Sequence, residues 1–274
     1  MPELPEVETV KRTLKELVVG KTIHSVSVFW PKIIKKPEEI EQFKEALVEE
    51  RIENVRRRGK FLLIDTDHYT LVSHLRMEGK YGVYQEEEEL APHTHIIFHF
   101  TDATALRYRD VRKFGTMHLF VKGKEQESLP LSKLGPEPFS SEFTSEFLAE
   151  KLSKTERAVK AALLDQSIFV GLGNIYVDEA LFRAGIHPDR KGKSIHNQEV
   201  PTLHKAIVET LGEAVEKGGS TIRSYVNSQG KIGTFQNELY VYGRKDESCR
   251  QCGNSIEKKV TAGRGTHFCP HCQE

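Results

Sequence analysis

The sequence predicts an α+β chain of several domains, with a β-rich first part, a helical middle part and a short cysteine-bearing hairpin at its end. Three observations carry this prediction. Residues 22–121 hold short runs rich in β-branched and aromatic side chains, residues 141–217 repeat apolar side chains at helical spacing, and all four cysteines lie between positions 249 and 272. With 274 residues, the chain is long enough for about two domains that each bury a core.

A leading amphipathic helix is expected over residues 5–18. Pro5 suits the first helical turn, where an N–H would have no partner, and the carboxylates of Glu6 and Glu8 suit the positive end of the helix dipole. Gly20 is then expected to end the helix. The apolar face of this helix follows helical spacing, at Val7, Val10, Leu14 and Leu17.

A β-sandwich or barrel is expected next, because several short strands follow one another at close spacing. Four helices are expected after a linker rich in proline and glycine. These changes in the spacing of apolar side chains divide the chain into four parts. They are a β-rich domain over residues 1–130, a linker over 131–138, a helical domain over 139–240 and a terminal hairpin over 241–274. The expected strands lie at 22–29, 60–65, 70–77, 94–100, 104–108 and 116–121, and the expected helices at 141–152, 156–165, 174–185 and 201–217.

Charge is balanced overall, with 40 basic and 40 acidic residues, so the net charge alone does not indicate a nucleic-acid partner. Its distribution is uneven. Residues 217–274 hold nine Lys or Arg against five acids, residues 107–113 hold four against one, and Arg56–Lys60 is a further basic run. This pattern fits one basic face on a neutral body, or charge scattered over a solvated surface.

The chain is expected to be a monomer in the cytoplasm. It has no apolar run near the roughly 18 residues that a membrane span needs. Its first residues are acidic and lack the charged and apolar regions of a secretory signal.

The cysteines are expected to hold one structural zinc ion. They form two Cys-x-x-Cys pairs separated by sixteen residues, a spacing that supplies four thiolates for tetrahedral Zn²⁺. Four protein ligands leave no open position for catalysis. His267 or His271 replacing one thiolate is the alternative. The ligands are Cys249, Cys252, Cys269 and Cys272.

The N-terminus offers a second candidate for chemistry. Removal of Met1 would leave Pro2 with a secondary amine, a group that is partly neutral and nucleophilic at cellular pH, and the start of the following helix favours the neutral form. Such an amine can attack a sugar C1′ and form an iminium ion. Glu3 is adjacent and can act as a general acid or base.

Seven segments, in order along the chain, resemble the formamidopyrimidine-DNA glycosylases, the bacterial family that repairs 8-oxoguanine. They are PELPEVET at 2–9, GKFL at 59–62, SHLRMEG at 73–79, LRYRDVRKFG at 106–115, GLGNIYVDEALFRAGI at 171–186, GGST at 218–221 and GRGTHFC at 263–269. The resemblance implies a β-sandwich with the leading helix, a helix–two-turn–helix domain and a zinc ribbon. The implied activity is removal of oxidised purines from double-stranded DNA, followed by cleavage at the abasic site.

The resemblance also implies the catalytic residues. Pro2 would be the nucleophile, Glu3 would transfer protons, and Lys60 would assist base release and β-elimination. Arg264 would contact the phosphates around the lesion and aid δ-elimination. Between the two cysteine pairs, Arg264 stands between two glycines, which suggests a turn with the guanidinium at its tip.

Further residues are implied in DNA binding. Asn174 is expected at the N-cap of a helix whose open amides suit phosphate. The residues expected to fill the space left by a flipped base, called here the void-filling set, are Met77, Arg112 and Phe114. A base-recognition loop is expected over about 218–238. The remaining implied contacts are His74, His93 and Lys258 near phosphates, also with Arg112, and Glu78, Ser220, Thr221 and Tyr225 near the base.

Two other functions fit parts of the pattern. The related endonuclease VIII branch, which removes oxidised pyrimidines, shares the proline, glutamate and lysine. Leu4 and the RDVRKFG run favour the purine branch. A non-catalytic DNA-binding protein with a zinc ribbon is the other alternative. The joint presence of Pro2, Glu3, Lys60 and Arg264 counts against it.

Overall fold

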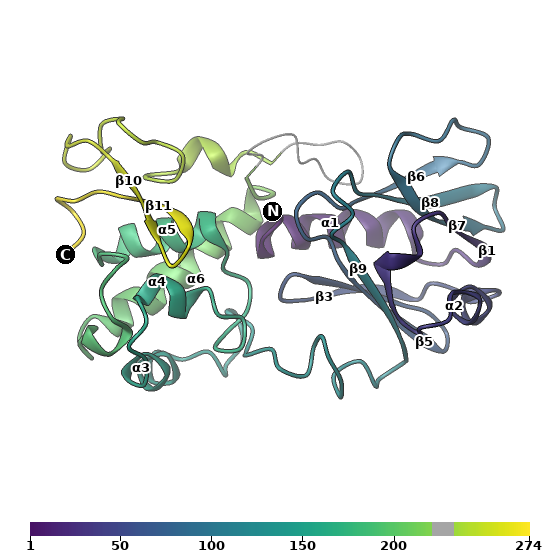
Figure 1. Ribbon diagram of the computed structural model, residues 1–274, viewed down its shortest axis with the longest axis horizontal. Helices are drawn as coiled ribbons and strands as arrows, with labels where there is room; N and C mark the ends of the chain where they lie inside the picture. The colour runs from purple at the N-terminus through teal and green to yellow at the C-terminus, as the bar shows by residue number, and fades with distance from the viewer. Residues whose placement is uncertain (221–232) are drawn as a thin grey trace. The chain divides into compact units, whose positions relative to one another are not determined.

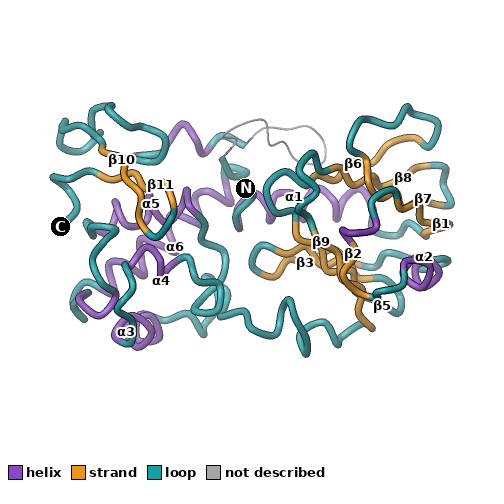
Figure 2. Tube along the Cα trace, viewed as in Figure 1, coloured by secondary structure: helices purple, strands orange, loops and turns teal. Residues whose placement is uncertain are grey.

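The computed structural model describes residues 1–220 and 233–274, which form two compact units. Of the described residues, the first unit covers 1–133 and Gly233, and the second covers 134–220 and 234–274. Strands gather in the first unit and helices in the second (Figures 1 and 2). The α+β fold class expected from the sequence is therefore confirmed.

Helix α1 spans Leu4–Val18 and opens the first unit. Its apolar face is buried in the core of that unit, at Val7, Val10, Leu14 and Val18. Gly20 follows with a φ of +90°, a left-handed conformation that glycine adopts without strain. The predicted helix is confirmed to within one residue at its start.

Two sheets share the core of the first unit, as in a β-sandwich. The four-stranded sheet has the order β1 (Ile23–Val28), β7 (Thr94–Phe100), β8 (Thr104–Arg109) and β6 (Lys80–Gln85). The five-stranded sheet has the order β2 (Ile34–Lys36), β9 (Thr116–Val121), β5 (Tyr69–His74), β4 (Phe61–Asp65) and β3 (Asn54–Arg58). All pairs are antiparallel except β2 with β9.

The first unit also contains elements that the sequence did not predict. Helix α2 (Ile40–Leu47) lies in a region expected to hold strands only, and its one-turn apolar pair, Phe43 and Leu47, is fully buried. Strands β2, β3 and β6 were also missed. In β3 only Val55 is buried and three arginines follow it, so its apolar alternation is too short to detect.

The second unit begins with four helices, as expected, although the first begins four residues and the second three residues later than predicted. These are α3 (Ser145–Ser153), α4 (Val159–Leu163), α5 (Asn174–Ala184) and α6 (Val200–Glu216). The predicted apolar stripe of α6 is buried at Leu203, Ile207 and Leu211. Gly218 and Gly219, both with positive φ, follow α6 and end it. A short 3₁₀ helix (Phe235–Glu238) and the hairpin β10 (Glu257–Thr261) and β11 (Arg264–Phe268) complete the unit.

No helix among the described residues is both long enough and apolar enough to span a bilayer.

Candidate active site and zinc centre

Glu3 is the N-cap of α1 and forms a reciprocal capping box with Glu6. The Glu3 side chain accepts from the backbone N–H of Glu6, and the Glu6 carboxylate accepts from the backbone N–H of Glu3 at 2.8 Å. Glu3 is only 2% exposed, and Pro2 before it is also buried. Pro2 therefore stands at the positive end of a 15-residue helix, where the dipole disfavours a protonated amine.

Lys60 lies in the turn between β3 and β4 and is 7% exposed. The chain reaches this turn through Gly59, which has a φ of +55°. Arg57 links the turn to α1, because its guanidinium donates to Glu8 at 3.0 Å and to the carbonyl of Gly59 at 2.9 Å. Although burial opposes ionisation of Glu8, hydrogen bonds from Lys11 and Arg57 hold its pKa below the usual value.

His74 ends β5 beside this turn, since Phe61 pairs with His74 and His74 with Thr116. Burial, with the positive charges of Arg76 and Lys60 nearby, lowers the pKa of His74 to about 3. The backbone N–H of Arg76 donates to Nδ1 at 2.9 Å, which leaves the ring proton on Nε2. His74 can thus offer a phosphate one N–H donor, but no charge.

Two connections between the sheets carry the void-filling set. Residues 75–79, the Met77 turn, join β5 to β6, and residues 110–115, the Arg112 loop, join β8 to β9. Met77 is 38% exposed and Phe114 is 51% exposed, so both apolar side chains are accessible from the surface. The Arg112 guanidinium lies 4.9 Å from the centre of the Phe114 ring.

Glu78 and His93 are also on the surface of the first unit. Glu78 belongs to the Met77 turn. His93 precedes β7, and its carbonyl accepts from the backbone N–H of Asp110 at 3.1 Å. This bond places His93 beside the start of the Arg112 loop.

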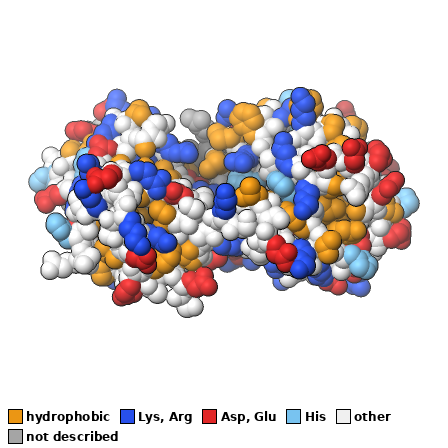
Figure 3. All heavy atoms as spheres, turned by 60° about the horizontal axis from the view of Figure 1, so that its bottom comes forward, with side chains coloured by type: hydrophobic (Ala, Val, Ile, Leu, Met, Phe, Trp, Pro, Cys, Tyr) orange, Lys and Arg blue, Asp and Glu red, His pale blue; other side chains and the backbone are white. Residues whose placement is uncertain are grey.

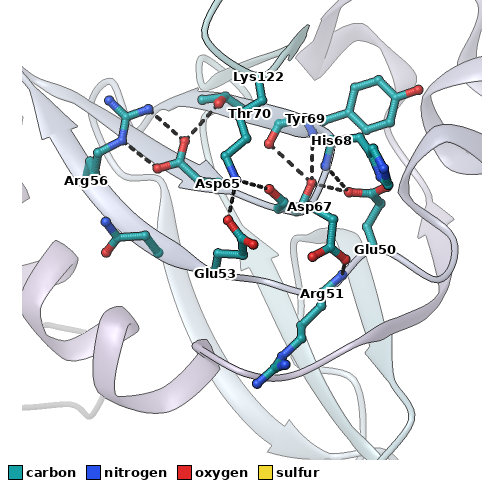
Figure 4. Close-up of polar contacts among 12 residues, drawn as sticks. Glu50, Arg51, Glu53, Arg56, Asp65, Asp67, His68, Tyr69, Thr70 and Lys122 are labelled. Atoms are coloured by element: carbon teal, nitrogen blue, oxygen red, sulfur yellow. Dashed lines mark hydrogen bonds and ion pairs between the residues drawn. The ribbon is translucent and has the colours of Figure 1, made fainter.

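Part of the predicted basic surface has a structural role instead. Arg107 is 3% exposed, and its guanidinium donates to four backbone carbonyls of residues 85–89. Arg56 is engaged by Asp65 at 2.5 and 2.7 Å, within a network of charged side chains on the five-stranded sheet (Figure 4). Arg107 is therefore not available as a phosphate contact, and the charge of Arg56 is balanced by Asp65 and Glu125.

On the face shown in Figure 3, many acidic side chains of the β-rich unit gather toward one end, while Lys and Arg side chains are spread more widely. The surface is thus uneven in charge although the net charge is zero. The basic residues outside ion pairs of this structural kind are the ones that could contact the phosphates implied by the resemblance.

Asn174 is not the N-cap that the sequence predicted. The cap is Gly173, and Asn174 is the first residue of α5. Its side-chain amide donates to the carbonyl of Gly265 at 2.8 Å, and thereby ties α5 to the terminal hairpin. Gly173, the second glycine of the run Gly171–Gly173, has the extended backbone of an N-cap residue. The helix therefore begins one position earlier than the sequence suggested.

Arg264 is not at the tip of the hairpin. The tip is Ala262–Gly263, both with positive φ (51° and 73°), and Arg264 is the exposed first residue of β11. Two such residues make the type I′ turn that suits a two-residue hairpin. Lys258 is exposed on β10 of the same hairpin, opposite His267.

A fully buried ion pair holds the hairpin to the helices, and sequence reasoning missed it. Lys160 of α4 contacts Asp178 of α5 at 2.7 Å, and both side chains have no exposed surface. The Lys160 ammonium also donates to the hydroxyl of Thr266 at 2.8 Å, and Asp178 accepts from the backbone N–H of His267 at 2.8 Å. The sequence feature that could have indicated this ion pair is the acidic pair Asp178–Glu179 within the largely apolar helix α5.

Glu179 makes the next anchor along α5. Its buried carboxylate accepts from three successive backbone N–H groups, of Tyr240, Val241 and Tyr242, at 2.8–2.9 Å. Burial raises the pKa of Glu179 despite these bonds. The chain entering the hairpin is thus fixed to the helix that also carries Asn174.

The four cysteines fit a tetrahedral metal centre. Their Sγ atoms all lie within 4.8 Å of one another, with Cys249 and Cys272 at 4.0 Å and Cys252 and Cys269 at 3.5 Å. Zn–S bonds of about 2.3 Å place tetrahedral sulfurs about 3.8 Å apart. Neither His267 nor His271 joins this cluster among the described residues. The prediction of one structural zinc site with four thiolates is confirmed.

Replacing one zinc ligand should affect the two units differently. Cys252→Ser should lose zinc and weaken DNA binding, because structural zinc supplies about 10–16 kcal/mol to small fingers. The first unit has its own core, so its unfolding should change little. Metal analysis and thermal unfolding followed by Trp30, the only tryptophan, measure both effects. Zinc-free wild-type protein, or an equal loss of stability around Trp30, would contradict this.

Residues at the ends of the predicted recognition loop are joined to each other. Phe235 N–H donates to the carbonyl of Gly219 at 3.0 Å, and Thr234 N–H to that of Lys217 at 3.1 Å. Ser220 is 5% exposed, and its N–H donates to the Tyr176 hydroxyl at 3.1 Å. The other two candidates in this loop, Thr221 and Tyr225, lie outside the described residues.

Comparisons with known proteins agree along the chain. Residues 1–117 match the formamidopyrimidine-DNA glycosylase N-terminal domain, residues 134–226 match its H2TH domain, and residues 246–274 match the zinc finger found in FPG and IleRS. Formamidopyrimidine-DNA glycosylases of Cytobacillus firmus and Bacillus subtilis are 64% and 62% identical to the chain, over 100% of it and at least 99% of each relative. The Lactococcus lactis Fpg, solved with DNA containing an abasic site, aligns over 100% of both chains with a TM-score of 0.94 and 42% identity.

Proposed function

Because this chain belongs to the formamidopyrimidine-DNA glycosylase family, we propose that Pro2, Glu3, Lys60 and Arg264 carry out a glycosylase and abasic-site lyase reaction on oxidised purines. The relatives at 62–64% identity carry the purine-lesion name, which favours this branch over endonuclease VIII. A solved relative is bound to DNA containing a benzylated formamidopyrimidine nucleotide. The substrate proposed here is accordingly duplex DNA with 8-oxoguanine, a formamidopyrimidine or an abasic site.

The first step is base release. The Pro2 nitrogen attacks C1′ of the damaged nucleoside, the bond from C1′ to the base breaks, and the base leaves with a proton. Glu3 supplies and accepts protons in this step, and Lys60 assists it. The Pro2 nitrogen, which has lost its proton, then expels the ring oxygen O4′ from C1′. O4′ leaves with the electron pair of the C1′–O4′ bond and takes up a proton, so the sugar ring opens. The resulting iminium ion between Pro2 and C1′ acts as an electron sink.

The second step is strand cleavage. Loss of a C2′ proton to a base breaks the C3′–O bond, and a further elimination breaks the C5′–O bond, so that each phosphate leaves with its electron pair. Arg264 stabilises the phosphates next to the lesion. Water then hydrolyses the iminium, which frees Pro2 and leaves a one-nucleotide gap.

The observation that best supports this proposal is the start of α1. Pro2 and Glu3 are consecutive, both are buried, and they occupy the end of the helix where a neutral amine is favoured. A solvated chain end without function has no need of this arrangement. The cytoplasmic location is part of the same proposal, since the substrate is chromosomal DNA.

The function is tested by cleavage of matched duplexes. One carries 8-oxoguanine, one a formamidopyrimidine and one an oxidised pyrimidine, in the same sequence context. Faster excision of both purine lesions is expected. Preference for the pyrimidine would support the endonuclease VIII branch, and binding without cleavage of any duplex would support the non-catalytic alternative.

DNA affinity should fall steeply with salt although the net charge is zero. Each neutralised phosphate releases counterions and contributes a slope of about −0.9 to the plot of log affinity against log salt. Lys258→Ala should reduce this slope by about one unit if Lys258 contacts a phosphate. Lys205→Ala, which removes an exposed lysine from α6, is the matched control. A flat plot, or equal slopes for the two variants, would count against the proposed contact.

A further inference from the structure

One buried hydroxyl lies against both connections that carry the void-filling set. Tyr108, on β8, is fully buried. A Cβ atom on Gly79, at the end of the Met77 turn, would lie 2.4 Å from the Tyr108 hydroxyl oxygen. A Cβ atom on Gly115, at the end of the Arg112 loop, would lie 1.7 Å from the same oxygen. Glycine at both positions is what allows this hydroxyl to touch the two connections at once.

Asp110 folds the Arg112 loop around its own carboxylate and is 1% exposed. Oδ1 accepts from the backbone N–H of Arg112 at 3.1 Å, and Oδ2 accepts from that of Gly115 at 2.8 Å. The Tyr108 hydroxyl donates to Oδ2 at 3.4 Å. The backbone N–H of Lys113 donates to the carbonyl of Asp110 at 3.2 Å. The loop is therefore organised in the protein without DNA.

From these contacts we infer that Tyr108 and Asp110 are positioning residues, which hold the void-filling set as one preformed unit. A preformed unit does not lose conformational freedom when it enters the duplex, so binding energy is left for extruding the base. The inference rests on the proposed function, because the unit matters only if it replaces a flipped base.

Substrates that differ in the cost of extrusion separate this role from a general loss of stability. An intact 8-oxoguanine must be unstacked before excision, whereas an abasic site has no base to unstack. Both reactions use the same proposed amine. A change that only weakens the first unit should slow both alike, and a change that disorders the void-filling set should slow excision of the intact lesion more.

The variants are Tyr108→Phe and Asp110→Asn. Asparagine keeps the size of Asp110. Its NH₂ group, however, would lie against a backbone N–H group that donates to a carboxylate oxygen in the wild-type protein. Tyr81→Phe is the matched control. Tyr81 is also buried and packs on Tyr108 with ring centroids 5.0 Å apart, but its hydroxyl donates to Ser73 at 2.8 Å.

We expect Asp110→Asn to slow single-turnover excision of 8-oxoguanine about tenfold or more, since a backbone N–H of the Arg112 loop loses its acceptor. Tyr108→Phe should slow it less, since the contact of its hydroxyl with Asp110 is long, at 3.4 Å. Cleavage at the abasic site should stay within about threefold in both variants. Tyr81→Phe should show no such difference between substrates. Equal slowing on both substrates, or no slowing on either, would overturn the inference.

A measurement on the free protein makes the test independent of activity. The Lys113 ammonium lies 3.9 Å over the ring of Trp30, so the fluorescence of this single tryptophan reports on the Arg112 loop. Asp110→Asn should shift the Trp30 emission, and Tyr81→Phe should not. Unchanged emission in Asp110→Asn would overturn the inference. If the wild-type protein fails to excise 8-oxoguanine, the proposed function is wrong, and the emission alone decides whether Asp110 orders the loop.

Discussion

A variant with one extra residue ahead of Pro2 is expected to lose the covalent adduct with DNA completely. Borohydride reduces the iminium formed on an abasic site and thereby traps the protein on the strand. The extra residue converts the Pro2 amine into an amide, whose lone pair is delocalised into the carbonyl. The variant should still fold, because α1 is capped by Glu3 and Glu6 and not by Pro2.

Lys60→Ala is the matched comparison, since lysine is the other possible amine nucleophile. It should slow base release but still form the trapped adduct on a ready-made abasic site. Mass spectrometry of the digested adduct should place the DNA on the N-terminal peptide, with Met1 absent. An adduct on Lys60, or full trapping by the extended variant, would show that Pro2 is not the nucleophile.

Glu3→Gln is expected to slow base excision by about 10²–10⁴-fold, the usual contribution of a general acid or base. Binding to the lesion should be retained. Glutamine keeps an oxygen that can accept from the N–H of Glu6, so the helix cap is preserved while the proton-transfer group is lost. Single-turnover excision and equilibrium binding measure the two effects separately.

Glu6→Gln is the control for capping, because the Glu6 carboxylate accepts from the N–H of Glu3 in the same capping box. Its excision rate should fall much less than that of Glu3→Gln. Equal losses in the two variants would show that Glu3 acts through the helix start and not through its own proton.

Local periodicity was enough to predict α1, six of the strands and the four helices of the second unit, because each has an apolar face of its own. The zinc site followed from ligand spacing alone. Helix α2 was missed although Phe43 and Leu47 follow helical spacing, because it is only eight residues long and lies in a part of the chain otherwise dominated by strands. Strand β3 was missed because three consecutive arginines follow Val55, so the strand shows no alternation of apolar and polar side chains.

The partners of polar side chains could not be predicted from the sequence. Arg107 stands in a run that reads as basic surface, yet tertiary structure turns it inward onto backbone carbonyls. Lys160 and Asp178 are 18 residues apart, and nothing in the sequence around either residue indicates that they pair. Asn174 was placed correctly near a helix start, but its partner on the hairpin is 91 residues away.

The anchoring of the hairpin bears on modularity. The last 29 residues match a finger that also occurs in another enzyme class, which suggests a portable unit. Here, however, the backbone around Arg264 is held by Lys160, Asn174 and Asp178, which all belong to the helices. Grafting the finger onto a different protein would transfer the zinc site. It would not transfer the contacts that fix the position of the backbone around Arg264. The transferable unit is the finger together with α4 and α5.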